Sequence, residues 1–366
     1  MVALGDRTRA VTRRTSPGKS GIVSNASGTA LTARRPSAWI LFGNVSGLYG
    51  LGGGKSILPA SCGYLPTSQC HVRRGPLRPI APRRTLRHAR TPPACGAPLR
   101  GASARYDFAG RVIAITGAAG DLGRATASRL AGDGAALVLL DLAEEPLRAF
   151  ARELETDGAS HLALSCDVTD GDAVDAAVSA AAERFGRIDG LFNSAGYQGA
   201  FAPVDTYPLD DFERVLAVNV TGVFLVLRAV SAHMRSAGGG AIVNAASHAG
   251  VRGPPNMIAY AASKFAVVGM TQTAARDLAP HGVRVNAVSP ALIGPGVMWE
   301  RQVRLQAATG THYFDPEPDA AGRAMIAGVP LGRLGTPDEV AQVVAFLLSD
   351  ASGYITGFNV EITGGI

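Results

Sequence analysis

Residues 106–366 predict an α/β fold, a doubly wound parallel β-sheet covered by helices on both faces. Short apolar runs alternate with longer helical stretches along this part of the chain, which is typical of parallel strands joined by crossover helices. The runs are almost continuously apolar, as expected for strands whose two faces are both buried. Roughly 260 residues without an internal repeat suit a single domain of this class.

The order of the elements follows directly from this alternation. The predicted strands, each a short apolar run, cover residues 112–116, 135–140, 161–166, 189–193, 241–246, 283–288 and 359–362. The predicted helices, each a longer stretch between two such runs, cover residues 121–132, 144–156, 170–185, 208–236, 257–279 and 337–348. The segment 294–330 fits neither pattern. It is a long insertion of mixed polarity, and we expect it to act as a lid.

The first 105 residues differ sharply in composition from this domain. They hold 17 of the 35 Lys and Arg residues and one of the 29 acidic residues, so their net charge is +16 and that of residues 106–366 is −10. They are rich in Arg, Pro, Gly and Ser and lack apolar periodicity, which predicts a disordered basic extension.

Three interpretations of the extension stay open. Its Arg- and Ser-rich composition fits an organellar transit peptide. Its Arg clusters, such as residues 83–87, could contact nucleic acid or an anionic membrane. It could also be an upstream stretch joined by a misplaced start codon. We expect a cytoplasmic protein, or an organellar one if the transit peptide is real.

Several classes of function are disfavoured by composition. No run in the extension reaches the roughly 20 apolar residues of a membrane span, and we predict none. The acidic domain argues against nucleic acid as substrate. The four cysteines form no C-x-x-C pair and the seven histidines are scattered, so we predict no metal site.

A glycine-rich turn follows the first predicted strand and opens the first helix. Residues 116–123 read TGAAGDLG, and glycines there bring backbone N–H groups close to a pyrophosphate at a helix N-terminus. Asp141 ends the second strand, 18 residues after Gly123. A carboxylate at this point accepts hydrogen bonds from ribose hydroxyls and repels a 2′-phosphate, which favours NAD over NADP. The alternative is an ordinary turn acid.

Tyr260 and Lys264 are four residues apart and share one face of a predicted helix. A neighbouring ammonium favours the phenolate, so we expect the pKa of Tyr260 to be lowered and its phenol to act as a general acid/base. Ser247 follows the strand predicted at 241–246 and could meet the phenol across a cleft. A Tyr and a Lys at this spacing also occur by chance in many helices.

Together these motifs resemble the classical short-chain dehydrogenase/reductase family over residues 108–365, which implies a Rossmann-type fold. Ser247, Tyr260 and Lys264 match its catalytic residues, and Asn219 matches a helix residue that holds a water in the proton relay. Asn219 could instead be a buried residue satisfied by backbone. The cofactor-binding residues implied are Gly117, Gly120, Asp121, Leu122, Gly123, Asp141, Asp167, Val168, Asn193, Ala195, Gly196, Tyr260, Lys264, Pro290 and Ile293.

Three positions depart from the family pattern. Asp121 replaces the usual middle glycine, and we expect it to cap the helix while pointing away from the phosphates. Ala291 replaces a glycine, and Pro295 stands where a Thr often bonds the carboxamide.

The resemblance implies NAD-dependent hydride transfer between a secondary alcohol and a ketone. Specificity is expected from loops beyond the strand ends, and the expected substrate contacts are Tyr197, Gln198, His248 and Trp299. Partly polar side chains suit a small hydroxylated or cyclic alcohol. The same fold also serves NADPH-dependent carbonyl or 3-oxoacyl reductases, and a third hypothesis is a catalytically silent dinucleotide-sensing or scaffold protein.

The predicted helices at 208–236 and 257–279 are apolar on more than one face, which favours a partner helix. The resemblance points the same way, to a homotetramer or homodimer. Burial under the domain's own loops is the alternative.

Overall fold

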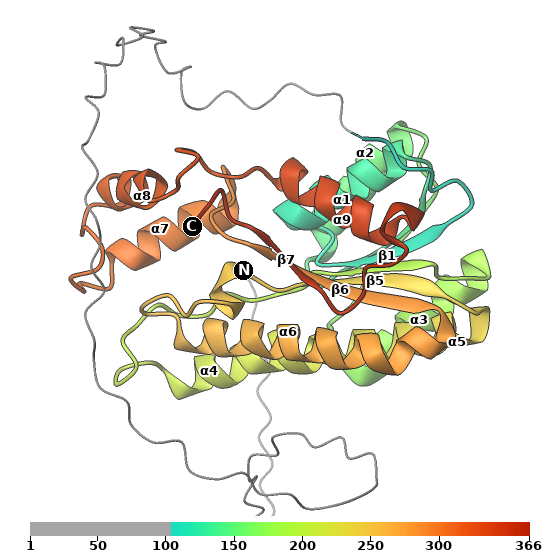
Figure 1. Ribbon diagram of the computed structural model, residues 1–366, viewed down its shortest axis with the longest axis horizontal. Coiled ribbons are helices and arrows are strands. Elements are labelled where there is room, and N and C mark those ends of the chain that lie inside the picture. Colours follow the sequence, from blue (N-terminus) through green and yellow to red (C-terminus); the bar gives the residue numbers. More distant parts are fainter. Residues whose placement is uncertain (1–103) are drawn as a thin grey trace, which may run out of the picture. The chain divides into compact units, whose positions relative to one another are not determined.

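A single parallel sheet of seven strands forms the centre of the domain (Figure 1). The computed structural model describes residues 104–366, so the predictions for the N-terminal extension lie outside the described residues. The strand order is β3-β2-β1-β4-β5-β6-β7, and the predicted class, a doubly wound Rossmann-type sheet, is confirmed. The strands are β1 (Val112–Thr116), β2 (Ala136–Asp141), β3 (His161–Ser165), β4 (Gly190–Asn193), β5 (Gly240–Ala245), β6 (Val283–Pro290) and β7 (Asn359–Ile362).

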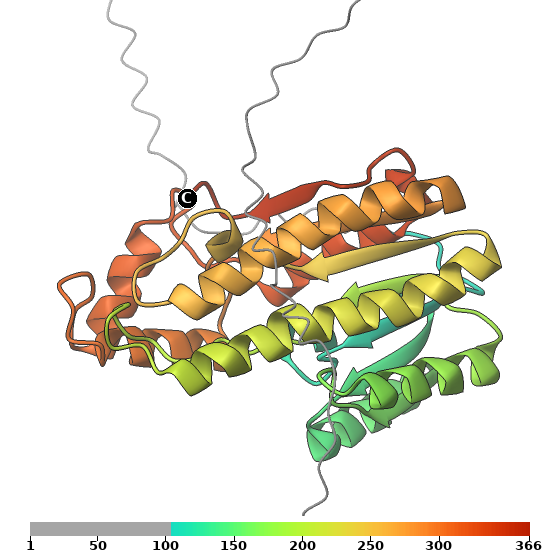
Figure 2. The same ribbon diagram turned by 90° about the horizontal axis from the view of Figure 1, so that it is seen from below.

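Helices cover both faces of the sheet. On one face α1, α2 and α9 pack around a core that includes Phe192 and Val243, and on the other α3, α5 and α6 pack around Leu191 and Ile242. Figure 2 shows α6 running beside the α4–α5 rod. The helices of the two layers are α1 (Asp121–Gly132), α2 (Glu144–Thr156), α3 (Gly171–Phe185), α4 (Leu209–Leu216), α5 (Val223–Ala237), α6 (Ile258–Leu278) and α9 (Pro337–Leu348).

The predicted elements agree with the structure except in two places. The helix predicted at 208–236 consists of α4 and α5 joined by a π-helical segment, Ala217–Gly222, that contains Asn219. The insertion at 294–330, called the lid below, contains two further helices that project together to one side of the sheet (Figure 1), α7 (Val297–Ala307) and α8 (Pro318–Ala327).

The strand order reverses between β1 and β4, and buried polar side chains fix the carboxyl ends of these strands. Thr116 Oγ1 donates to Asn193 Oδ1 at 3.1 Å and accepts from the backbone N–H groups of Ser194 and Ala195. Asn193 Nδ2 donates to the Val223 carbonyl at 3.0 Å. In open α/β sheets, ligands bind outside the strand ends at such a reversal.

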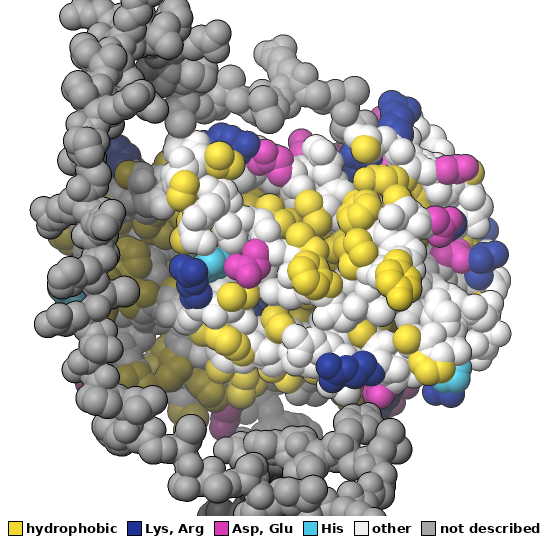
Figure 3. Space-filling model, viewed as in Figure 1, with side chains coloured by type: hydrophobic (Ala, Val, Ile, Leu, Met, Phe, Trp, Pro, Cys, Tyr) yellow, Lys and Arg dark blue, Asp and Glu magenta, His cyan; other side chains and the backbone are white. Residues whose placement is uncertain are grey.

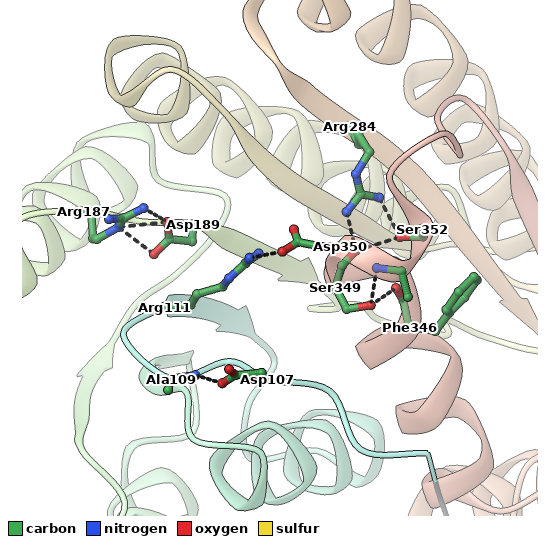
Figure 4. A network of polar contacts seen from close by, with 11 residues as sticks. Asp107, Ala109, Arg111, Arg187, Asp189, Arg284, Phe346, Ser349, Asp350 and Ser352 are labelled. Carbon is green, nitrogen blue, oxygen red and sulfur yellow. Dashed lines mark hydrogen bonds and ion pairs between the residues drawn. The ribbon is translucent and has the colours of Figure 1, made fainter.

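A second polar network lies at the other end of the strands, near their amino ends (Figure 4). The Arg284 guanidinium, at the start of β6, donates to the carbonyls of Leu347 and Ser349 and to Ser352 Oγ at 2.8–2.9 Å. It thereby caps the C-terminal end of α9. Arg111 pairs with Asp350 beside it. The network lies at the amino ends of the strands, away from the reversal.

Within the described residues, one helical stretch is long and apolar enough to cross a membrane by length and composition, Leu209–Ala237. It comprises α4, the π-helical segment and α5. Its α5 part carries Val226, Val230 and Met234, which are fully buried against the sheet. The apolar side chains of this stretch therefore contribute to the core between α5 and the sheet.

Candidate active site

A cavity of about 930 Å³ opens at the carboxyl ends of the strands. Most of the predicted cofactor-binding residues line it, and so do Ser247 and all four predicted substrate contacts. Asn193, Asn219 and Lys264 do not line it; they lie behind its wall. Its cofactor-side lining comprises Gly117, Gly120, Asp121, Leu122, Gly123, Asp141, Asp167, Val168, Ala195, Gly196, Tyr260, Pro290 and Ile293.

The glycine-rich turn requires glycine at two points because backbone approaches backbone. A Cβ at Gly123 would lie 2.2 Å from the Gly117 carbonyl oxygen. Gly117 has φ of 66°, and a Cβ there would lie 2.9 Å from Ala195 Cα. The turn is thus folded tightly against the β4 loop, and α1 begins directly at the cavity. This cradle fits a dinucleotide pyrophosphate at a helix N-terminus.

Asp121 does not cap α1 as expected. The N-cap residue is Gly120, no side chain caps the helix, and Asp121 is its first helical residue. A carboxylate in the first turn is still favourable for the helix dipole. A Cβ on Gly296 would lie 2.4 Å from one carboxylate oxygen of Asp121. The Asp121 side chain therefore packs against the start of the lid.

Asp141 supports the turn as well as lining the cavity. One carboxylate oxygen accepts from the Ala119 N–H at 2.9 Å and the other from the Ala143 N–H at 2.8 Å. The alternative interpretation, a turn acid, therefore describes part of its role. Because a carboxylate oxygen has more than one acceptor site, these bonds leave capacity for ribose hydroxyls.

The side chains of Tyr260 and Ser247 lie beside each other at the wall of the cavity. Tyr260 lies in the first turn of α6, and Ser247 ends the stretch after β5 and caps a short 3-10 helix by accepting from the Ala249 N–H at 3.1 Å. Burial raises the pKa of the Tyr260 phenol, and the polar Ser247 side chain beside it opposes that rise.

Lys264 lies one turn further along α6 and is almost fully buried, with 3% of its surface exposed. Its Nζ donates to the Ala245 carbonyl at 2.7 Å and lies 5.6 Å from the centre of the Tyr260 ring. Desolvation lowers the pKa of Lys264 to about 8. The expected lowering of the Tyr260 pKa by Lys264 is therefore wrong for this structure, because burial dominates and the ammonium is bound to a carbonyl.

Asn219 is fully buried and bound to backbone on both sides of its amide. Its Oδ1 accepts from the Tyr197 N–H at 2.7 Å, and its Nδ2 donates to the Tyr197 carbonyl at 2.8 Å and to Ser263 Oγ at 3.0 Å. The π-helical segment turns this side chain inward, and such segments often occur at functional sites. Asn219 Oδ1 and Lys264 Nζ flank Gly196, within 3.4 and 3.6 Å of where its Cβ would lie.

Two predicted substrate contacts have their polar atoms engaged by protein. The Tyr197 hydroxyl donates to Asp211 Oδ1 at 2.9 Å, so Tyr197 presents its ring rather than a free hydroxyl. The Gln198 side chain donates to Gln302 Oε1 at 3.0 Å and accepts from the Arg301 guanidinium at 3.1 Å. Both of these partners are on α7, so Gln198 contacts the lid.

The other two predicted contacts, His248 and Trp299, also line the cavity. His248 Nδ1 lies 3.6 Å from Glu361 Oε2 and makes no hydrogen bond within residues 104–366. Trp299 belongs to α7, and its ring packs against Gly294. A Cβ on Gly294 would lie 3.1 Å from the Trp299 ring. The lid thus places an aromatic side chain over the site.

Sequence reasoning missed three arginines that line the substrate side of the cavity, Arg214, Arg252 and Arg301. The Arg214 guanidinium lies 4.5 Å from the centre of the Tyr197 ring, and Arg301 lies on the same ring at 5.9 Å. Their positions in the chain carry no motif, and only the fold brings them to the cavity. Among residues 104–366, no group of three or more His, Cys, Asp or Glu side chains is arranged to hold a metal ion.

Known proteins are similar to this chain in sequence and in fold. A family model described as enoyl-(acyl carrier protein) reductase matches residues 117–366. The levodione reductase of Leifsonia aquatica is 43% identical over 261 residues, which cover 70% of this chain and 94% of that protein. The D-threitol dehydrogenase of Mycolicibacterium smegmatis is 40% identical over 265 residues, 72% of this chain and 96% of that protein.

A solved structure of an NAD+-bound xylitol dehydrogenase is 52% identical and superposes with a TM-score of 0.70, covering 70% of this chain and 99% of that one. Fold, cavity and relatives define an oxidoreductase built on a dinucleotide-binding sheet. The chain belongs to the short-chain dehydrogenase/reductase family.

Proposed function

We propose that the protein is an NAD-dependent dehydrogenase that interconverts a small polyol or cyclic secondary alcohol and its ketone. The observation that carries this proposal is that Tyr260 and Ser247 lie beside each other at the cavity wall, with Lys264 one helical turn away. The similarity to xylitol, D-threitol and levodione enzymes supports the substrate class.

The two hydroxyls suit proton transfer to and from a substrate oxygen. Burial raises the pKa of Tyr260, so at neutral pH the phenol is protonated and can donate to a ketone oxygen. In the opposite direction its phenolate accepts the alcohol proton, while the Ser247 hydroxyl holds the same oxygen by a hydrogen bond. When bound, the nicotinamide supplies or accepts the hydride.

Lys264 and Asn219 would act from behind the cavity wall. In this proposal the Lys264 ammonium, held by the Ala245 carbonyl, would bond a nicotinamide ribose and stabilise a phenolate when one forms. Asn219 fixes the loop at Tyr197 and lies with Lys264 beside Gly196. A water held there would link Lys264 to solvent.

Asp141 supports NAD as the cofactor. It lines the cavity at the end of β2, where a ribose 2′-phosphate would meet its negative charge. The relatives named as NAD+-bound or NAD+-dependent favour the same choice.

The oligomeric state is part of the proposal. Phe224 on α5 and Phe265 on α6 expose about half of their surfaces, at 48% and 49%, and would pair with the same helices of a second copy. Figure 3 shows further hydrophobic side chains over α9 and the segment before β7, where Tyr354 and Phe358 are exposed. Two such faces suit a homotetramer.

We further propose a boundary near residue 105 between extension and catalytic domain, and a cytoplasmic location unless the extension is a transit peptide. The acidic domain and the packing of α5 against the sheet support a protein that neither binds nucleic acid through this domain nor spans a membrane.

The test is a panel of xylitol, threitol, cyclic alcohols and a 3-hydroxyacyl thioester with NAD and with NADP. Tyr260→Phe should lower kcat about 10²- to 10⁴-fold by removing the transferable proton, with little change in NADH binding by fluorescence titration. Tyr106→Phe, at a tyrosine that packs against the core outside the cavity lining, is the matched control. A Tyr260→Phe protein as active as wild type would sink the mechanism.

A further inference from the structure

Asn256 has a backbone conformation that side chains rarely adopt. Among residues 104–366 it is the one non-glycine with positive φ, at 66°, and it is buried, with 9% of its surface exposed. Asn tolerates this region better than most residues. Its carbonyl accepts from the Ala202 N–H at 2.9 Å, which joins the loop before α6 to the loop after β4.

The side chain of Asn256 reaches a third segment, the lid. Its Nδ2 has three acceptors in range: Gln306 Oε1 and Thr311 Oγ1 at 3.1 Å each, and Thr309 Oγ1 at 3.4 Å. Gln306, at the end of α7, is 1% exposed. A buried amide that is paired in this way is expensive to displace.

Neither Asn256 nor Gln306 lines the cavity, whereas Trp299, Arg301 and Gln302 at the other part of α7 do. The contacts of Asn256 therefore hold α7 without touching a substrate. Asn256 also lies four residues before Tyr260, so the same loop that leads into the catalytic helix carries the lid's attachment point.

Gln198 forms a second attachment on the cavity side. Its amide is engaged by Arg301 and Gln302, and Arg301 also donates to the Gly199 carbonyl at 2.9 Å. Both attachments join α7 to loops that border the catalytic hydroxyls. They use neutral amides, with Arg301 the only charged group among them.

We propose that Asn256 is a positioning residue that latches the lid over the substrate side of the cavity and thereby sets the KM for the alcohol. Gln198 belongs to the same latch and acts through α7. Lid closure excludes water and holds the substrate, so a loosened latch weakens alcohol binding more than it slows the chemistry. The kinetic part of this inference rests on the proposed function, whereas the structural part does not.

The chain offers its own reporter of lid position. Its two tryptophans are Trp39 and Trp299, so in a Trp39→Phe parent the emission comes from the lid alone. Asn256→Gly keeps the positive φ and removes the amide. Arg304→Gln, at an exposed position on the same helix outside the cavity lining, is the matched control.

In this parent, Asn256→Gly should raise the acrylamide quenching constant of Trp299 about twofold and the KM about tenfold, with kcat within about threefold. Arg304→Gln should change none of these. Gln306→Met, which removes the partner on the lid, should reproduce the effect, and the double variant should be no worse than the stronger single variant.

Unchanged quenching and unchanged KM in Asn256→Gly would overturn the latch, as would a loss of kcat at constant KM, which would place Asn256 in support of α6 alone. If Asn256→Gly does not fold, Gln306→Met decides by the same criteria. A wild-type protein that oxidises no alcohol would refute the proposed function, and the quenching comparison would still decide whether the lid is latched.

Discussion

At the scale of single residues, the site combines a buried ammonium with a buried phenol. Lys264 is held in its charged form by one carbonyl, and desolvation lowers its pKa from 10.5 to about 8. Below pH 8 the folded protein therefore carries the full cost of a buried charge. Residues that serve function often lower the stability of the folded protein in this way.

Lys264→Met should stabilise the fold and abolish activity. Met has a similar shape and no charge, so we expect a gain of about 1–3 kcal/mol in the free energy of unfolding at pH 7, reduced by the lost bond to Ala245. Urea unfolding at several pH values checks this.

The pH dependence of that gain has a defined sign. Between pH 8 and 10.5 the unfolded wild-type chain keeps the Lys264 proton while the folded one loses it, so wild-type stability rises with pH. The advantage of Lys264→Met should therefore be full below pH 8 and shrink above it. An advantage that grows with pH would contradict the assignment.

Asp141→Asn should relax the choice of cofactor. Removing the negative charge should lower the preference for NADH over NADPH about tenfold or more, which corresponds to ~1.4 kcal/mol. Because the Asn amide replaces one oxygen that accepts from Ala119 or Ala143, a loss of about 1 kcal/mol in stability should accompany it. Steady-state kinetics with both cofactors measure the ratio, and an unchanged ratio would remove Asp141 from cofactor selection.

At the scale of elements, the short and regular parts of the fold were predictable and the insertion was not. Strands such as β1 and β7 and helices such as α1 and α9 follow from continuous apolar runs and clear breaks. The lid helices α7 and α8 lie in a segment of mixed polarity with no strand between them, and the contacts of α7 with Gln198 and Asn256 are long-range. Such contacts leave no local pattern in the sequence.

The π-helical segment shows the same limit. Residues 217–222 continue a helical pattern in the sequence, and the π-helical turn that carries Asn219 lies where α4, packed against α6, continues into α5, packed against the sheet. The catalytic motif itself could be found because Tyr260 and Lys264 are local to one helix. The pKa values of Tyr260 and Lys264 depend on burial and, for Tyr260, on Ser247, which lies outside α6, so they could not be predicted.

Arg284→Met tests the network at the amino ends of the strands. Without the guanidinium, α9 loses its C-terminal cap, and we expect a loss of about 1–3 kcal/mol in unfolding free energy. Because the network lies at the amino ends of the strands and the cavity at their carboxyl ends, kcat and KM should stay within about twofold as long as the protein is folded. Chemical denaturation with parallel kinetics is the measurement, and altered kinetics at unchanged stability would contradict it.

At the scale of the whole molecule, the apolar faces of α5 and α6 lead to a prediction about assembly. Phe224→Glu with Phe265→Glu places two charges on that face, so the protein should sediment as a smaller species than wild type at equal concentration. Phe265→Leu, which keeps the face apolar, is the control. Sedimentation identical to wild type in the doubly charged variant would show that another face holds the copies together.

Asp141 joins two tasks that are separate in principle, the choice of coenzyme and the folding of the turn that receives it. During evolution, a lineage that exchanged this side chain for a smaller or basic one would lose the brace at Ala119 and Ala143 in the same step. A compensating change in the turn would then have to arise first or simultaneously. We therefore expect the alcohol specificity, which depends on the separate lid, to change more readily during evolution than the cofactor specificity.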